Sequence, residues 1–153
     1  MLILLFYTGN DLYAIESSHV VEVIPRVSLR TVHHVPDYVA GLFNYRGIIA
    51  PVIDLCHLIQ DTPSRAYLST RIIIVKRDQP NSAVQYLGLM AERVTETLTI
   101  SSDEIRRSSL RAEAAPYLSG IIVDEKRMIQ CVQLEQLFSD KRHTDLLNSE
   151  YAE

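Results

Sequence analysis

The stretch Pro36-Asp-Tyr-Val-Ala-Gly-Leu-Phe-Asn-Tyr-Arg-Gly-Ile-Ile-Ala-Pro-Val-Ile-Asp-Leu55 decides the fold, because it is apolar almost throughout yet is interrupted once near its centre. The interruption is Asn44-Tyr45-Arg46-Gly47, and such a cluster between two apolar runs is typical of a turn between strands. We therefore predict a β-hairpin here. Arg46 would stand on a rigid support, with its charge free to meet a partner.

Composition predicts an ordinary globular core. The chain has 153 residues, of which 47% are apolar and 22% are charged, which suits one compact domain or two small subdomains. The net charge of -4 argues against nucleic-acid binding, because phosphate recognition needs a basic face. The apolar run at residues 1–6 is too short for a membrane span or a signal peptide. We therefore expect a cytoplasmic protein without direct membrane insertion.

Strand signals dominate the rest of the chain. Apolar and β-branched runs predict strands over residues 2–7, 12–15, 20–24, 71–75, 86–90, 121–123 and 128–132. Helical signals are short: one turn over 37–40, a capped turn over 103–106 and a helix from 134 that residues 146–147 could continue. We expect the polar residues 148–153 to fray. The predicted class is all-β with short helices and a C-terminal helix.

The chain also contains an internal repeat. A shift of 79 residues places Gly41 on Gly120 and Val52 on Cys131, and a shift of 74 places Glu22 on Glu96. The two shifts differ by the length of an ordinary loop insertion. Chance similarity between strand-rich segments is the alternative. Two copies of one small β unit, roughly residues 12–59 and 86–138, would suggest two small barrels or bent sheets packed together, with a binding groove between them.

No motif in the sequence points to catalysis. Asp54-Leu-Cys-His57 is the only cluster that combines a carboxylate, a thiol and an imidazole, and it lacks the spacing of known metal motifs. Neither a nucleophile elbow nor a glycine-rich phosphate loop is present. A small hydrolase that uses Asp54 and His57 is a rival hypothesis, but we expect no catalytic residue, no metal and no cofactor. Cys56 and Cys131 should be free buried thiols.

Binding is the better hypothesis, and Arg46 is its main candidate. Glu22, which follows an apolar strand, is the carboxylate that we expect to hold the guanidinium beside an apolar groove. Such a pair fixes geometry more than it adds stability when it is exposed. The alternative is that Arg46 is simply a solvated turn residue.

These segments, read together, resemble the CheW family. The resemblance rests on Tyr13-Ala14-Ile15, on Val20-Val21-Glu22-Val23-Ile24, on Val35-Pro36 with Gly41, and most specifically on Asn44-Tyr45-Arg46-Gly47 with Pro51-Val52-Ile53-Asp54-Leu55. It continues through the Gly120 region to Leu137. Tyr45 departs from the family pattern, which usually has leucine there. The resemblance implies two intertwined five-stranded SH3-like barrels within residues 1–140, followed by a helical or frayed tail over 141–153.

The resemblance further implies a non-catalytic adaptor that couples methyl-accepting chemoreceptors to a CheA-type histidine kinase and is recruited to membrane receptor arrays. A regulator that sequesters kinase or receptor, or an adaptor in a pilus or surface-sensing pathway, is the alternative. Positions carried over by motif give two sets of contact residues. The receptor-binding set is Val20, Glu22, Gly41, Asn44 and Arg46, and the kinase-binding set is Leu29 and Thr31.

Overall fold

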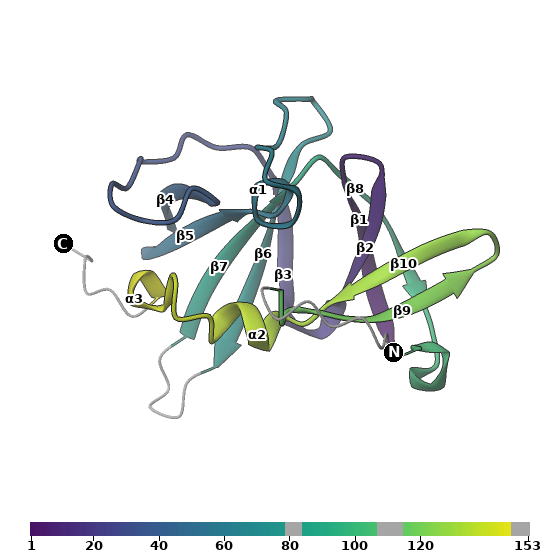
Figure 1. Cartoon of the computed structure of the whole chain (residues 1–153). Coiled ribbons are helices and arrows are strands. Elements are labelled where there is room, and N and C mark those ends of the chain that lie inside the picture. The colour runs from purple at the N-terminus through teal and green to yellow at the C-terminus, as the bar shows by residue number, and fades with distance from the viewer. Residues whose placement is uncertain (79–83, 107–114, 148–153) are drawn as a thin grey trace.

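The computed structural model describes residues 1–78, 84–106 and 115–147, which form two five-stranded sheets that lie side by side (Figure 1). Sheet A has the order β8 (Arg93–Thr99), β1 (Leu2–Thr8), β2 (Asp11–Glu16), β10 (Arg127–Val132), β9 (Leu118–Asp124). Sheet B has the order β3 (Val20–Pro25), β6 (Arg71–Asp78), β7 (Val84–Ala91), β5 (Ile48–Asp54), β4 (Val39–Tyr45). The predicted all-β class, with two SH3-like subdomains, is confirmed.

The hairpin predicted from the opening stretch is present. β4 and β5 pair antiparallel in a register that places Tyr45 opposite Ile48, so Arg46 and Gly47 alone form the loop. Both loop residues have positive φ, 52° and 85°, as a two-residue turn that follows the strand twist requires. The backbone N–H of Gly47 donates to Oδ1 of Asn44 at 2.8 Å, which closes the turn.

The repeat is visible in the strand order, but its two units do not coincide with the two sheets. β3, β4 and β5 of the first unit lie in sheet B, whereas β2 lies in sheet A; the second unit is divided in the opposite sense. Parallel pairing joins the units: Val52 lies opposite Gly88, and Cys131 lies opposite Ala14. Shifts of 79 and 74 residues convert one pair into the other, so the structure reproduces both sequence offsets. The division at residue 140 stays a prediction.

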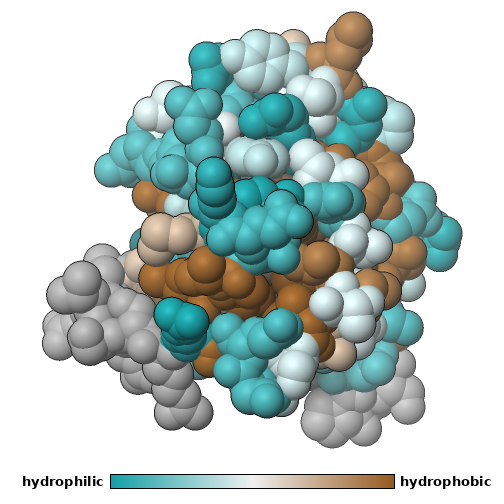
Figure 2. Space-filling model, turned by 90° about the vertical axis from the view of Figure 1, so that its right-hand side faces the viewer, coloured by the Kyte–Doolittle hydropathy of each residue, from teal (hydrophilic) through white to brown (hydrophobic). Residues whose placement is uncertain are grey.

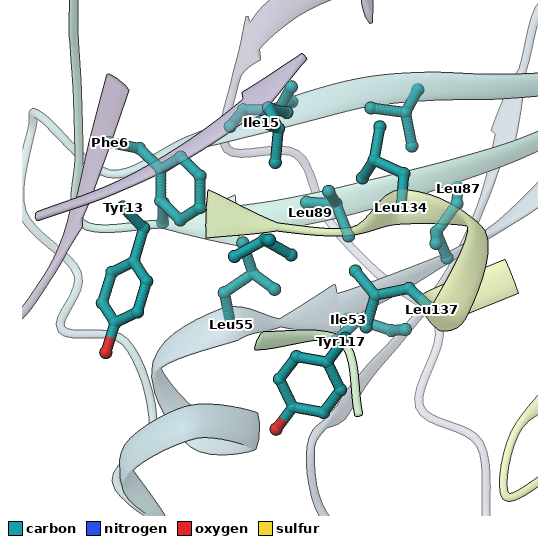
Figure 3. Packing of buried hydrophobic residues seen from close by; sticks show 14 of the residues in the cluster. Phe6, Tyr13, Ile15, Ile53, Leu55, Leu87, Leu89, Tyr117, Leu134 and Leu137 are labelled. Atoms are coloured by element: carbon teal, nitrogen blue, oxygen red, sulfur yellow. The ribbon is translucent and has the colours of Figure 1, made fainter. Parts of the chain in front are cut away.

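The central strands are buried on both faces. In β6, Ile72 and Ile74 point into sheet B's own core, while Ile73 and Val75 join a core shared with sheet A. β1 alternates in the same way, because Leu5 lies inside sheet A and Phe6 lies in the shared core. Figure 3 shows that the shared core gathers side chains from both sheets and from α2 (Leu134–Phe138). Continuous apolar runs in these strands follow from this double burial.

Short helices flank the junction of the sheets. α1 (Leu55–Gln60) and α2 (Leu134–Phe138) occupy equivalent places after β5 and β10 and lie apart in Figure 1. The capped turn predicted over 103–106 is present one to two residues earlier, as η2 (Ser102–Glu104) with a capping box at Ser101. η1 (Ser17–His19) links β2 to β3. α3 (Thr144–Leu147) adds Leu146 to the shared core. The tail at 148–153 lies outside the described residues.

Two local predictions were wrong. The helix that begins at Leu134 ends at Phe138, so residues 146–147 do not continue it but belong to the separate α3. Residues 37–40 do not form a helical turn, because Val39 already belongs to β4 and its N–H donates to the carbonyl of Pro36 in a turn. The helix α1 was not predicted, although Asp54 before Leu55 is an ordinary N-cap residue.

Candidate functional site

The candidate site lies where the two edges of sheet B come together. β3 and β4 are the outer strands of that sheet, yet Glu22 of β3 reaches the β4–β5 turn, where its Oε2 accepts a hydrogen bond from Nη2 of Arg46 at 2.6 Å. The backbone of Arg30 also pairs with that of Leu42 in β4, at 2.8 and 2.9 Å. The sheet is therefore curled until its edges meet, as in a small barrel.

The arginine is held in place but remains accessible. The side chain of Arg46 is 61% exposed and that of Glu22 is 37% exposed. An ion pair at this exposure contributes about 0–1 kcal/mol to stability. The ion pair instead orients the Arg46 guanidinium, because Glu22 holds it at one nitrogen while the side chain remains mostly exposed. The pairing of Arg46 with Glu22, predicted from sequence, is present in the structure.

Tyr45 contacts the ion pair of Arg46 and Glu22 from the buried side. Its ring is buried, and its hydroxyl donates to Oε2 of Glu22 at 2.8 Å. The ring contacts Tyr86 edge-on, with centroids 5.0 Å apart, and the Cζ atom of Arg46 lies 5.1 Å from its centroid. Burial, together with the hydrogen bond to Glu22, raises the pKa of Tyr45 to about 12. The sequence indicated that Tyr45 is unusual but did not indicate its hydrogen bond to Glu22.

Gly41 has a structural reason to be glycine. Its φ is +151°, and a Cβ atom there would lie 2.6 Å from the carbonyl oxygen of Arg30 and 2.9 Å from Cβ of Leu29. The segment after β3 thus crosses directly over β4. Gly120, its repeat equivalent, meets Ile105 in the same manner.

The structure places the remaining predicted residues around this crossing. Leu29 is half-buried and packs on the core of sheet B, whereas Thr31 is exposed. Asn44 is exposed and holds the turn through Gly47. Val20 begins β3 and packs on the shared core. The two predicted contact sets therefore adjoin one another at Gly41 and Leu29. Their roles as receptor and kinase contacts stay predictions.

The second copy of the repeat also has an ion pair at the position of Glu22, but its arginine comes from a different place in the sequence. Glu96 of β8 is equivalent to Glu22, and it accepts from Nη1 of Arg127 at 2.7 Å. Asp124 binds the same guanidinium at 2.6 Å. The loop position equivalent to Arg46 is Glu125, also with positive φ, at 56°. The carboxylate is thus kept in both copies, while the arginine is supplied from a different position.

The cluster around Asp54 is structural in its contacts. The carboxylate is buried, and its oxygens accept from the backbone N–H groups of Cys56 and His57, at 3.1 and 3.3 Å, and from Ser64. It therefore caps α1 and anchors the following loop. Within the described ranges, no group of three or more His, Cys, Asp or Glu side chains could hold a metal ion. Both cysteines are free, with Cys56 buried and Cys131 half-buried.

A hollow of about 650 Å³ opens on the other sheet. Ile3, Ile15, Ile105, Gly120 and Leu134 are among the residues that line it. Figure 2, which views the molecule from the side of sheet A, shows apolar surface bordered by polar side chains. None of the predicted contact residues lines this hollow, so the structure separates it from the site at Arg46.

Comparison with known proteins gives consistent similarities along the chain. A family model described as the CheW-like domain matches residues 2–142. Chemotaxis protein CheW of Klebsiella aerogenes is 29% identical over 141 residues, which cover 90% of this chain and 81% of that protein. Chemotaxis protein CheW of Treponema pallidum is 26% identical over 150 residues, which cover 94% of this chain and 85% of that protein.

A solved structure is similar over most of the fold. The crystal structure of the scaffolding protein TtCheW from Thermoanaerobacter tengcongensis superposes with a TM-score of 0.77 at 28% identity, covering 92% of this chain and 88% of that one. In the part of the chain that the structure describes, every helix is too short or too polar to cross a membrane.

Proposed function

The chain belongs to the CheW family, and from that premise we propose that it is a non-catalytic adaptor that couples chemoreceptors to a CheA-type histidine kinase. A role as a chemotaxis coupling adaptor agrees with the curated relatives and the scaffolding protein of the same fold. The finer assignment, to a receptor on one side and a kinase on the other, is our proposal. So is its location, in the cytoplasm at membrane receptor arrays.

The observation that best supports a receptor-binding role is the arrangement of Arg46. Glu22 and a two-residue turn fix the start and the end of this side chain, while 61% of it remains exposed. A receptor tip of helical hairpins would present rows of side chains to such a surface. A fixed guanidinium suits recognition of a carboxylate there, because its N–H groups form a planar fork.

The kinase contact is proposed for the segment that crosses β4. Leu29 and Thr31 lie on either side of the backbone bridge between Arg30 and Leu42. That bridge and the close approach at Gly41 hold the segment in place. Because the two contact sets adjoin one another, both partners would meet sheet B from neighbouring directions.

Binding measurements with charge reversals test this proposal. The probes are the soluble cytoplasmic fragments of the organism's chemoreceptors and its CheA-type kinase. Arg46→Glu should abolish receptor binding and leave kinase binding measurable. Arg127→Glu is the matched control. It breaks the ion pair between Arg127 and Glu96 within sheet A, the counterpart of the pair between Arg46 and Glu22, and should leave receptor binding intact.

Two outcomes would count against the proposal. If Arg46→Glu changes neither interaction, the site assignment is wrong. If the protein binds each partner alone but never both together, and lowers kinase activity instead of coupling it to receptors, the protein is a sequestering regulator.

A further inference from the structure

Tyr45, the last residue of β4, makes a polar contact that an aliphatic side chain at this position could not make. Its hydroxyl donates to Oε2 of Glu22 at 2.8 Å, and the same oxygen accepts from Nη2 of Arg46 at 2.6 Å. One carboxylate oxygen therefore joins a buried phenol to an exposed guanidinium. The three side chains form a continuous hydrogen-bonded unit.

The phenol is the rigid member of this unit. Tyr45 is 6% exposed, and its ring is flanked edge-on by Tyr86 and Phe43, with centroids 5.0 and 6.0 Å away. A ring enclosed in this way has little rotamer freedom, so its hydroxyl points in one direction. Burial raises the pKa of Tyr45 to about 12, and the hydroxyl therefore stays protonated and remains a donor at physiological pH.

Glu22 and Arg46 would be poorly ordered without that donor. Both side chains are partly exposed, at 37% and 61%. Long side chains that meet in water lose rotamer entropy about as large as the attraction they gain, so such pairs are populated only part of the time. A hydrogen bond from a buried group holds the carboxylate in one rotamer before the arginine arrives.

We propose that Tyr45 is a positioning residue for partner recognition: it fixes Glu22, and through Glu22 it fixes the direction of the Arg46 guanidinium toward a carboxylate on a receptor hairpin. The inference rests on the proposed receptor role of Arg46. A guanidinium that is already oriented loses less entropy on binding than a mobile one. Affinity at this face would thus depend on a hydroxyl that does not itself touch the partner.

A double-mutant cycle in receptor binding tests the inference. Tyr45→Phe keeps the ring and removes only the hydroxyl. We expect it to weaken binding of a receptor cytoplasmic fragment by about three- to tenfold, which is less than the loss of a direct hydrogen bond to a charged group, because the hydroxyl does not touch the partner. In a Glu22→Ala background, which lacks the acceptor, the same change should have little further effect. A role in packing alone would produce equal losses in both backgrounds.

Tyr86→Phe is the matched control. It removes a hydroxyl from the ring that packs against Tyr45. Because the hydrogen bond from Tyr45 to Glu22 is kept, we expect receptor affinity within about twofold of wild type, a difference of less than about 0.5 kcal/mol. A loss as large as that of Tyr45→Phe would overturn the inference in favour of general loosening of the aromatic cluster.

A second measurement needs no partner. The heteronuclear NOE of the Arg46 Nε–Hε group reports its order on the picosecond to nanosecond timescale. It should fall in Tyr45→Phe and stay at the wild-type value in Tyr86→Phe. An unchanged NOE in folded Tyr45→Phe would overturn the inference.

The failure of the inference can be distinguished from that of the proposed function. If Arg46→Ala does not weaken receptor binding, the proposed site is wrong, whatever the NOE shows. If Arg46→Ala weakens binding while Tyr45→Phe does not, the site stands and the positioning role of Tyr45 is wrong.

Discussion

Replacing Gly41 by alanine should destabilise the protein strongly, and the structure allows the cost to be worked out. A methyl group there would lie 2.6 Å from the carbonyl oxygen of Arg30 and 2.9 Å from Cβ of Leu29. Overpacking of this kind costs about 1–3 kcal/mol. The backbone φ of +151° adds about 1–2 kcal/mol for a residue with a side chain. We expect a loss of about 2–5 kcal/mol in the free energy of unfolding.

Gly47→Ala is the control that separates the two contributions. Gly47 also has positive φ, +85°, but a Cβ atom there would meet nothing within 4 Å. It should therefore cost only the backbone contribution of about 1–2 kcal/mol. Urea unfolding measures both variants, and an unchanged slope would show that stability alone has changed. At about 2–4 °C per kcal/mol for a chain of this size, the melting temperatures should differ clearly.

Equal losses in the two variants would refute the argument. They would mean that the Leu29–Arg30 segment yields to a methyl group without cost, so its crossing over β4 does not constrain the site. A stable Gly41→Ala protein that nevertheless loses receptor binding would instead give Gly41 a contact role that strain does not explain.

Three further predictions concern polar groups that are buried or half-buried. Asp54→Ala should lower the free energy of unfolding by about 2–4 kcal/mol, because it removes a helix cap and leaves the half-buried donors of Ser64 unpaired; urea unfolding measures this, and a loss below about 0.5 kcal/mol would contradict it. Burial lowers the pKa of His143, whose Nδ1 pairs with the hydroxyl of Tyr38 at 2.8 Å. Its contribution is therefore present above the unfolded pKa of about 6.5 and is lost as pH falls below it, so stability between pH 7.5 and 5.5 should decline in wild type and stay flatter in His143→Gln. Burial raises the pKa of Cys131 to about 11. A thiol-specific disulfide reagent at pH 7.5 should modify it about tenfold more slowly in the folded than in the unfolded protein, because the loss of thiolate outweighs the higher nucleophilicity of a less acidic thiol; comparable rates would contradict this.

Local signals in the sequence were sufficient for the hairpin and for the ion pair. Asn44 to Gly47 interrupts two apolar runs, and a two-residue loop with positive φ is what such an interruption encodes. Glu22 lies within an apolar run that ends at Pro25, which marks it as a strand residue near a sheet edge. The ion pair between Glu22 and Arg46 could be predicted because these two opposite charges each accompany an apolar strand.

Other features could not be predicted, because they depend on tertiary choices. The repeat was detectable, but nothing in it states that β2 pairs with β10 rather than with the strands of its own unit. Residues 37–40 do not form the expected helical turn, because β4 begins at Val39, which already pairs with Ile53. α1 has six residues and a nearly continuous apolar sequence, so no helical period is visible; the capping signal of Asp54 was present and was overlooked.

The hydroxyl of Tyr45 illustrates a different difficulty. Within an apolar run, a tyrosine is most simply a core residue, and its ring is indeed buried. Only the curl of the sheet brings Glu22 of a distant strand to its hydroxyl. Sequence spacing therefore could not show the contact between Tyr45 and Glu22.

The exchange of strands between the repeat units has a consequence for how such a chain could have arisen. β1 to β5 and β6 to β10 each supply one hairpin to one sheet and three strands to the other. Two separate copies of a half-length chain could form the same eight strand pairings only by swapping their first hairpins. The fold thus has the geometry of a domain-swapped homodimer whose two subunits are joined covalently. In such a molecule neither half is self-sufficient, and after fusion the two halves are free to diverge, one keeping arginine at its turn and the other an acid.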